Sequence, residues 1–279
     1  MRLQNSIELK EPFSLAQTLE CGQIFRVFKR NDYYIVPYKG SVLKLAQHRN
    51  MLSYEVFGKE VSKTELGNFL GITHSISEIN QYLLNRDKRI LPFLDYVKGL
   101  RIIKMEPYEA AISFIFSIQS SIKLISKRLN ILSEIVGRPV KVDDEIIFLF
   151  PTSKELGKLS NRDISLLRLG FREKFFREFI EKYSEKDFEK ITSKSFEEKE
   201  KFLLSIRGVG KKVAHCILLF GFGELSAFPV DVWIKRALEC YFGISGSPKK
   251  LTEEGRAIFG KFSGYAQEYI YAYIRVFNS

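Results

Sequence analysis

The spacing of apolar and polar positions predicts two kinds of structure along this chain. Between residues 24 and 47, segments rich in β-branched and aromatic residues are separated by Asn31-Asp32 and by Gly40, which favour turns. The strands expected from this pattern are residues 24–30, 33–39 and 41–47. Apolar residues at helical spacing follow, and the helices expected there are residues 63–70, 76–85 and 92–100.

From Pro107 onward the pattern is helical, with glycines marking breaks between segments. The helices expected here are residues 107–119, 121–136, 163–168, 172–183, 195–206, 211–221, 232–242, 250–260 and 263–277. The charged run from Glu181 to Lys201 is interpreted as a solvated helix face and loop. The fold class is therefore α+β. An N-terminal α+β domain with an antiparallel sheet, residues 1–102, is expected to pack on an all-α domain, residues 103–279.

The net charge of the chain indicates the kind of partner that it binds. Lysine and arginine number 44 against 33 acidic residues, which gives a formal charge of +11 and favours a polyanionic partner. The three cysteines are widely separated and the three histidines are scattered, so neither set has metal-ligand spacing, and no cofactor is expected. The chain shows no signal pattern and no long apolar span. A cytoplasmic monomer without membrane contact is expected, associated with the nucleoid if the source is prokaryotic.

A glycine turn lies between two of the expected helices. Gly208 and Gly210 flank Val209, so the backbone can adopt positive φ values and approach a partner closely. Lys211 and Lys212 open the next helix, where free N–H groups and the helix dipole favour an anion such as a phosphate. Taken alone, this turn is equally consistent with an ordinary connection between helices.

Asp231 and Lys212 are the candidate catalytic residues. Asp231 follows Pro229 and opens the helix expected at residues 232–242, where an aspartate caps a helix well. A carboxylate held there could also stabilise positive charge on a sugar. The Lys212 amine could attack an anomeric carbon and form an imine. Lysine is protonated in water at neutral pH, so this chemistry needs a desolvating pocket. The simpler interpretation of Lys212 is a surface lysine that binds phosphate.

Residues 208–214, Gly-Val-Gly-Lys-Lys-Val-Ala, and residues 229–232, Pro-Val-Asp-Val, resemble the helix-hairpin-helix and aspartate signature of base-excision DNA glycosylases. Residues 20–26, 169–172 and 264–267 match further landmarks of the 8-oxoguanine DNA glycosylase family in the same order. The resemblance covers nearly the whole chain. It implies a TBP-like N-terminal domain, with the active site in the cleft between the two domains.

The resemblance also implies an activity. A bifunctional glycosylase/AP lyase of this family flips 8-oxoguanine out of double-stranded DNA and excises it through a lysine Schiff base, followed by β-elimination. Lys212 matches the nucleophile and Asp231 the catalytic aspartate. Two alternatives stay open: a glycosylase for another damaged purine, and a non-catalytic helix-hairpin-helix DNA-binding protein. The lysine at position 212 argues against alkylation enzymes, which generally lack it.

Base recognition is assigned through the same resemblance. The Gly22 carbonyl would accept the N7 hydrogen that 8-oxoguanine has and guanine lacks, and Gln267 would bond to the base edge. Tyr271 would stack on one face of the ring and Cys216 would lie on the other. From spacing alone, Gln267 and Tyr271 share one helix face, as do Lys212 and Cys216.

Contacts to the opposite base and the backbone depart from the family pattern. Gln119 stands where an asparagine is expected, and Leu124 replaces an arginine, whereas Arg172 matches a second arginine. Because leucine has no donor for a base edge, a relaxed opposite-base preference is predicted. Trp233 replaces a histidine seen in relatives. The other DNA-binding residues expected are Phe171, Gly208, Val209, Gly210 and Lys211, and a monovalent cation is expected at the carbonyls of Leu204, Ile206 and Val209.

Overall fold

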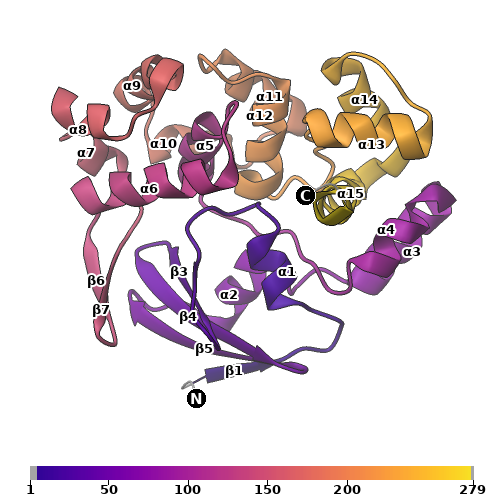
Figure 1. The fold of residues 1–279 in the computed structure, drawn as a ribbon, viewed down its shortest axis with the longest axis horizontal. Helices are drawn as coiled ribbons and strands as arrows, with labels where there is room; N and C mark the ends of the chain where they lie inside the picture. Colours follow the sequence, from indigo (N-terminus) through magenta and orange to yellow (C-terminus); the bar gives the residue numbers. More distant parts are fainter. Residues whose placement is uncertain (1–4, 278–279) are drawn as a thin grey trace.

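A five-stranded antiparallel sheet forms the lower part of the molecule in Figure 1, in the computed structural model, which describes residues 5–277. Its strand order is β1-β5-β4-β3-β2. The strands are β1 (Asn5–Glu8), β2 (Phe28–Lys29), β3 (Tyr34–Tyr38), β4 (Ser41–His48) and β5 (Met51–Gly58). The two strands predicted at residues 33–39 and 41–47 are confirmed as β3 and β4. They are joined by Lys39-Gly40, both with positive φ, as a two-residue hairpin requires.

The strand predicted at residues 24–30 is wrong over most of its length. Only β2 pairs with the sheet, because the preceding segment turns into the interior. There Arg26 is buried and donates to the Phe148 carbonyl at 2.6 Å, and Gln23 donates to the Arg101 carbonyl at 2.6 Å. Strands β1 and β5 were not predicted, although β5 does bury Leu52 and Tyr54 at alternate positions.

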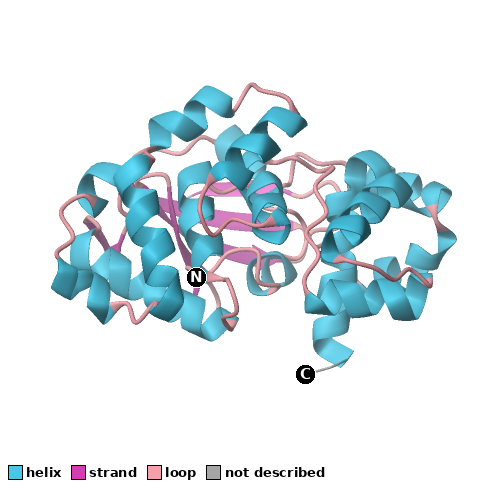
Figure 2. Ribbon diagram, turned by 90° about the horizontal axis from the view of Figure 1, so that it is seen from above, coloured by secondary structure: helices cyan, strands magenta, loops and turns pink. Residues whose placement is uncertain are grey.

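Helices cover the sheet from above, and Figure 2 shows the strands behind them. In the N-terminal third they are α1 (Leu15–Glu20), α2 (Lys63–Phe69), α3 (Ile76–Arg86) and α4 (Leu91–Tyr96). The remainder are α5 (Pro107–Phe116), α6 (Ile122–Val136), α7 (Ser153–Leu156), α8 (Asn161–Leu166), α9 (Glu173–Lys182), α10 (Glu185–Ile191), α11 (Phe196–Ser205), α12 (Lys211–Ile217), α13 (Val232–Phe242), α14 (Pro248–Phe259) and α15 (Ser263–Phe277). None of these helices is both long and apolar enough to cross a membrane, in the part of the chain that the structure describes.

The predicted helices are confirmed, most of them to within two or three residues, with three additions. The short helices α1, α7 and α10 were not predicted, and α10 lies inside the charged run that was interpreted as a solvated helix face and loop. Helix α12 ends at Ile217 and continues as a wider π-helical turn over Leu218–Phe222.

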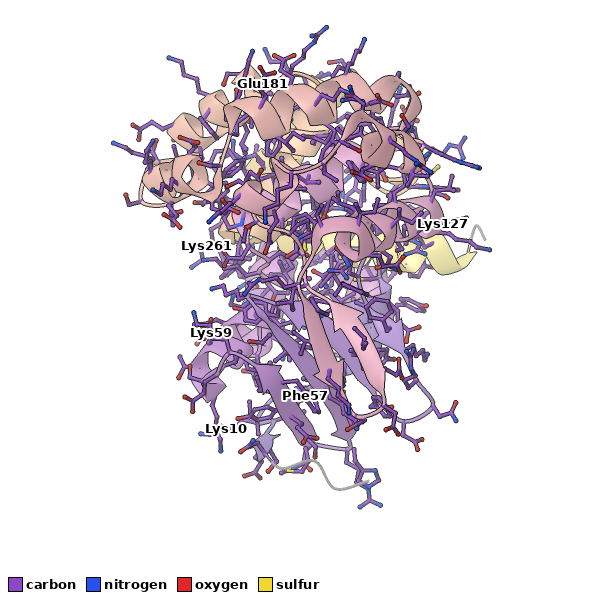
Figure 3. The ribbon with its side chains drawn as sticks, turned by 90° about the vertical axis from the view of Figure 1, so that its left-hand side faces the viewer. Lys10, Phe57, Lys59, Lys127, Glu181 and Lys261 are labelled. Atoms are coloured by element: carbon purple, nitrogen blue, oxygen red, sulfur yellow. The ribbon has the colours of Figure 1, made fainter. Side chains whose placement is uncertain are left out.

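A hairpin interrupts the helical half of the chain. Strands β6 (Pro139–Val142) and β7 (Glu145–Phe148) pair with each other and lie across the sheet, as Figure 3 shows. The sheet therefore has two covered faces. Leu43 and Leu45 point into the main core, whereas Val42 and Ile35 pack with the hairpin. An ion pair of 2.5 Å joins the buried Lys44 to Asp143 at the hairpin turn.

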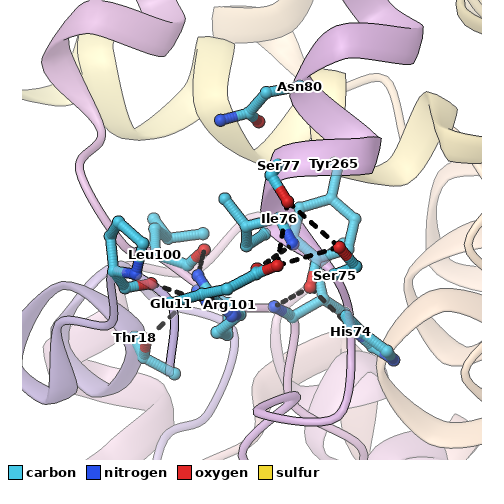
Figure 4. Close-up of polar contacts among 12 residues, drawn as sticks. Glu11, Thr18, His74, Ser75, Ile76, Ser77, Asn80, Leu100, Arg101 and Tyr265 are labelled. Carbon is cyan, nitrogen blue, oxygen red and sulfur yellow. Dashed lines mark hydrogen bonds and ion pairs between the residues drawn. The ribbon is translucent and has the colours of Figure 1, made fainter. Parts of the chain in front are cut away.

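The helices α3 and α4 pack on α14 and α15 rather than on the sheet. A polar network at the start of α3 fixes this arrangement (Figure 4). Glu11 accepts hydrogen bonds from the hydroxyls of Ser75 and Ser77, both at 2.9 Å, and from the first backbone N–H of α3. The His74 ring bonds to the Tyr265 hydroxyl at 2.7 Å, which ties this region to α15. The domain boundary near residue 102 stays a prediction.

Candidate active site

A cavity of about 810 Å³ lies where the turn after α1 meets α5, α6, α12, α15 and the start of α13. Ten residues singled out from the sequence line it: Gly22, Gln119, Gly208, Gly210, Lys211, Lys212, Cys216, Asp231, Gln267 and Tyr271. They come from five separate segments of the chain. Val209, Phe171 and Arg172 are not among the residues that line this cavity.

The hairpin between α11 and α12 has a backbone that only glycine can supply at one position. Gly208 has a φ of +88°, and a Cβ there would lie 2.5 Å from the Phe175 ring. The Val209 side chain is buried, and its N–H donates to the Ile206 carbonyl at 3.0 Å. Gly210 precedes α12 without a side-chain cap, so the first N–H groups of that helix are open to an approaching anion.

The two lysines that open α12 differ in their partners. Lys211 forms an ion pair of 2.9 Å with Glu200 of α11. The Lys212 Nζ lies 3.5 Å from the Ser117 hydroxyl and 5.5 Å from the centre of the Phe114 ring. No carboxylate within residues 5–277 forms an ion pair with Lys212. Its amine therefore faces an aromatic ring and a hydroxyl inside the cavity.

Asp231 caps α13. Its Oδ1 accepts hydrogen bonds from the backbone N–H groups of Trp233 at 3.0 Å and Ile234 at 2.9 Å. Two bonds to one oxygen fix the carboxylate, while Oδ2 makes no hydrogen bond with the described residues. The capping role is confirmed, and the same geometry leaves one oxygen available to the cavity.

A buried histidine links the two catalytic candidates. His215 lies one turn after Lys212 on α12 and is fully buried. Its Nδ1 accepts the Phe228 N–H at 2.9 Å, so the ring proton sits on Nε2, which donates to Glu200 at 2.6 Å. Burial lowers the pKa of His215 to about 4, against the opposing effect of Glu200. This neutral histidine joins α12 to the segment that leads to Asp231.

The far end of the cavity carries polar groups without partners. Gln267 is 5 % exposed, and its Oε1 has no hydrogen-bond partner among the described residues. Burial raises the pKa of the Cys216 thiol to about 11, so the thiol is neutral at physiological pH. Burial also raises the pKa of the half-buried Tyr271, which stays a neutral phenol.

Among the lining residues that were not predicted, Phe114, Ser117, Glu268 and Arg275 bear on the chemistry proposed below. Glu268 is 2 % exposed, and burial raises the pKa of its carboxyl to about 7. A charged residue within the otherwise apolar, aromatic segment after Gln267 was a usable signal for Glu268. No local pattern distinguishes Phe114 and Ser117 from ordinary residues of a buried helix end.

The Arg172 side chain does not lie free to contact the opposite base, as its predicted role requires. It is 7 % exposed and donates to the carbonyls of Ile118, Gln119 and Leu169. The guanidinium thus braces the loop after α5, and reading a base requires it to leave these carbonyls. Phe171 is 46 % exposed beside it, and Gln119 is exposed with a φ of +47°. The opposite-base role of Arg172 stays a prediction.

The monovalent cation site also stays a prediction. Two of the three carbonyls expected to hold the ion, those of Ile206 and Val209, flank Gly208 in the hairpin, and the Ile206 oxygen already accepts the Val209 N–H. A carbonyl has a second lone pair, so this bond leaves room for an ion. In residues 5–277, no cluster of histidine, cysteine or acidic side chains could hold a metal.

Comparison with known proteins gives the family. A model described as the 8-oxoguanine DNA glycosylase N-terminal domain matches residues 6–111. The 8-oxoguanine glycosylase/lyase of Clostridium acetobutylicum, solved with double-stranded DNA containing cytosine opposite 8-oxoguanine, superposes with a TM-score of 0.90. It is 30% identical to this chain over 100% of both chains. The chain belongs to the 8-oxoguanine DNA glycosylase family.

Other members of the family are similar over most of the chain. The N-glycosylase/DNA lyase of Saccharomyces cerevisiae is 28% identical over 273 residues, covering 88% of this chain and 72% of the yeast protein. A probable N-glycosylase/DNA lyase of Methanothermobacter thermautotrophicus is 28% identical over 216 residues, covering 70% of this chain and 69% of the archaeal protein. The 3-methyladenine DNA glycosylase of Archaeoglobus fulgidus, at 18% identity and a TM-score of 0.81, shows only that the fold is shared.

Proposed function

We propose that this protein is a bifunctional DNA glycosylase/AP lyase that excises 8-oxoguanine from double-stranded DNA. The observation that carries the proposal is the Lys212 amine, which faces the cavity without a carboxylate partner among the described residues. Asp231 and the base-recognition candidates line the same cavity. Family membership supports the choice of lesion, because relatives are named as N-glycosylase/DNA lyases and as 8-oxoguanine glycosylase/lyase.

The reaction begins when the damaged nucleotide leaves the stacked duplex and enters the cavity. The neutral Lys212 amine attacks the sugar C1′, the bond between C1′ and N9 breaks, and the base leaves with the electron pair and takes up a proton. Ring opening then gives an imine between Lys212 and C1′. The imine acidifies the hydrogens on C2′, so loss of a C2′ proton expels the 3′ phosphate by β-elimination.

The residues around Lys212 suit these steps. The Lys212 Nζ lies 5.5 Å from the centre of the Phe114 ring and 3.5 Å from the Ser117 hydroxyl, so the amine is held at the cavity wall where a bound sugar would lie. Asp231 would stabilise positive charge on the sugar as the base departs. Because a carboxylate favours a protonated lysine, Asp231 is not assigned the role of activating Lys212.

Base recognition in this proposal uses the other end of the cavity. The Gly22 carbonyl accepts the N7 hydrogen of 8-oxoguanine, and the free Oε1 of Gln267 accepts a hydrogen bond from the base edge. The neutral phenol of Tyr271 and the neutral thiol of Cys216 provide the two faces between which a planar ring can lie. Their neutrality matters because a charge there would be costly to bury.

Recognition of the opposite base is proposed to be weak. Leu124 is 48 % exposed on the first turn of α6, where it offers a base no hydrogen bond. Gln119 and Arg172 are the remaining candidates, and the Arg172 guanidinium is occupied by backbone carbonyls. We further propose that the protein acts as a cytoplasmic monomer; sedimentation that gives a stable dimer at working concentration contradicts the monomer.

Borohydride trapping tests the proposed function. The wild-type protein, incubated with a duplex containing 8-oxoguanine and borohydride, is expected to form a covalent adduct through reduction of the imine. Lys212→Gln abolishes the adduct, whereas Lys211→Gln, on the adjacent ion-paired lysine, retains it. Adduct formation on another damaged purine only supports the alternative glycosylase, and DNA binding without base release supports the non-catalytic alternative.

A further inference from the structure

The turn that follows α1 is held between two helices of the other half of the molecule. Gly22 has a φ of +104°, and a Cβ there would lie 2.7 Å from the Ile122 Cδ1 and 3.1 Å from the Arg275 Nη1. Arg275 donates from Nη1 to the Cys21 carbonyl at 2.6 Å. The peptide that precedes Gly22 is therefore fixed by a charged side chain from α15, and the Gly22 carbonyl follows directly from it.

A carboxyl group contacts the same turn from α15. Glu268 lies two helical turns before Arg275 and so shares its helix face. The carboxyl is buried near the Cys21 thiol, and burial, followed by the negative charge of Glu268, raises the pKa of that thiol. The Glu268 Oε1 has no partner among the described residues. We call Cys21, Glu268 and Arg275 the Cys21 clamp.

The arrangement of the Cys21 clamp differs from an ordinary structural ion pair. Within the described residues, neither Glu268 nor Arg275 forms an ion pair with any other residue. Arg275 donates to the carbonyl of Cys21, whereas the Glu268 carboxyl lies near its thiol, which donates to the Thr18 carbonyl at 3.5 Å. A buried carboxyl and a partly exposed guanidinium thus both lie against Cys21 at the edge of the cavity. Burial of a carboxyl such as that of Glu268 is unfavourable, which indicates a role for it at this turn.

We propose, resting on the proposed function, that Glu268 and Arg275 are positioning residues for the Gly22 carbonyl and set the discrimination between 8-oxoguanine and guanine. The N7 of 8-oxoguanine carries a hydrogen, whereas the N7 of guanine carries a lone pair that repels a carbonyl oxygen. Discrimination therefore depends on where this oxygen points. The strength of a hydrogen bond falls steeply as its distance and angle depart from the optimum. A small rotation of the peptide therefore weakens the preference for 8-oxoguanine over guanine.

Two assays on one enzyme separate positioning from chemistry. Excision of 8-oxoguanine requires the Gly22 carbonyl, whereas cleavage at a preformed abasic site uses Lys212 without a base to read. In Arg275→Met and Glu268→Gln, excision is expected to fall by roughly 10- to 100-fold, because a small misplacement has effects of this size. Abasic-site cleavage stays within about twofold of the wild type. Glu253→Gln, at an exposed position on α14, is the matched control.

The pH profile supplies a readout that a merely structural role does not move. Burial raises the pKa of Glu268 to about 7, while the nearby Cys21 thiol and the positive charge of Arg275 lower it. The titratable and charged groups that face it are Cys21, Cys216, Asp231, Tyr271 and Arg275. Ionised Glu268 attracts Arg275 and strengthens the clamp. The ratio of excision to abasic cleavage therefore rises from about pH 6 to about pH 8 in the wild type and is flat in Glu268→Gln.

The results distinguish a wrong positioning role for Glu268 and Arg275 from a wrong proposed function. If the wild type excises 8-oxoguanine and both variants keep the wild-type ratio of excision to abasic cleavage, the positioning role is wrong. Equal loss of both activities, or a lowered melting temperature that accounts for it, also overturns the role. A wild type that cleaves abasic sites but releases no 8-oxoguanine overturns the proposed function itself, before any variant is compared.

Discussion

Two regions of the molecule differ in how their polar groups are paired. One is the interface between the sheet and the β6–β7 hairpin, which we call the seam, and the other is the cavity around Lys212. At the seam, the buried Lys44 is paired with Asp143, and Arg30 is paired with Glu145 through two hydrogen bonds. In the cavity, Lys212 has no ion-pair partner among the described residues, and Gln267 and Glu268 each keep an unbonded oxygen. Buried polar groups are normally satisfied, so these two open oxygens at the cavity wall are available to a bound nucleotide.

The largest effect in this comparison is expected from Asp231→Asn. Asparagine caps helices as well as aspartate does, so the fold is retained and only the charge in the cavity is lost. We expect base excision to slow by about 100-fold or more, with DNA affinity changed little. Single-turnover excision rates and binding isotherms on the same duplex check this. Unchanged turnover would remove Asp231 from the catalytic group.

The next effect is a loss of folding stability at low pH that depends on His215. Burial lowers its pKa to about 4. At a pH between this value and the ordinary histidine pKa of about 6.5, His215 is therefore protonated in the unfolded chain but neutral in the folded protein. The stabilisation is fully present above the ordinary histidine pKa of about 6.5 and is lost as pH falls toward 4. We expect roughly 2–3 kcal/mol less stability at the acidic end of this window. Urea unfolding across this pH window gives the slope.

His215→Gln is expected to flatten that slope while lowering stability at neutral pH, because the Phe228 N–H then loses its imidazole acceptor. His48→Gln, at the exposed end of β4, is the control and keeps the wild-type slope. A variant at position 215 with the wild-type acid dependence shows that other groups bind the proton.

A smaller effect is expected at the seam. Asp143→Ala leaves the buried Lys44 without its carboxylate, although half of the Asp143 side chain is solvent-exposed and Lys44 also lies 4.6 Å from the centre of the Tyr33 ring. Breaking a fully buried pair costs about 3–5 kcal/mol, so exposure reduces the expected loss to about 1–2 kcal/mol. Chemical denaturation measures it, with Asp144→Ala as the neighbouring control. Catalytic rates stay unchanged, and a parallel loss of activity contradicts the separation of the two regions.

The smallest effect concerns the opposite base. Duplexes with 8-oxoguanine opposite each of the four bases are expected to be cleaved at rates within about tenfold, because one good base contact is worth only about 1–3 kcal/mol and Leu124 makes none. Leu124→Arg is expected to raise the preference for cytosine by about tenfold. A strong cytosine preference in the wild type defeats the prediction.

How much could be predicted from the sequence depends on whether the determining contacts are local. The helices of the second half follow from dense apolar periodicity, and Lys212 and Asp231 follow from short motifs. The hairpin at residues 139–148 was missed because its strands are short and their partner, the sheet, lies about a hundred residues away in the chain. Its turn residues, Asp143-Asp144, were a signal that was not used.

The cavity shows the same division between local and distant information. Arg172 was predicted as a DNA contact from its motif, but a sequence does not say whether a guanidinium is already occupied by carbonyls such as that of Gln119. The positioning roles proposed for Glu268 and Arg275 depend on their contacts with Cys21, which lies more than 240 residues earlier in the chain. Packing between distant segments, rather than propensity, decides these roles.

The β6–β7 hairpin has a practical consequence for anyone who divides this protein. Although it belongs to the second half of the chain, it supplies Val142 and Ile147 to one face of the sheet built by the first half. A fragment that stops near residue 102 leaves Ile35 and Val42 uncovered, and the complementary fragment carries an unsupported apolar ribbon. Such surfaces promote self-association. The halves should therefore be produced together or joined, with Val42 as the place to watch for aggregation.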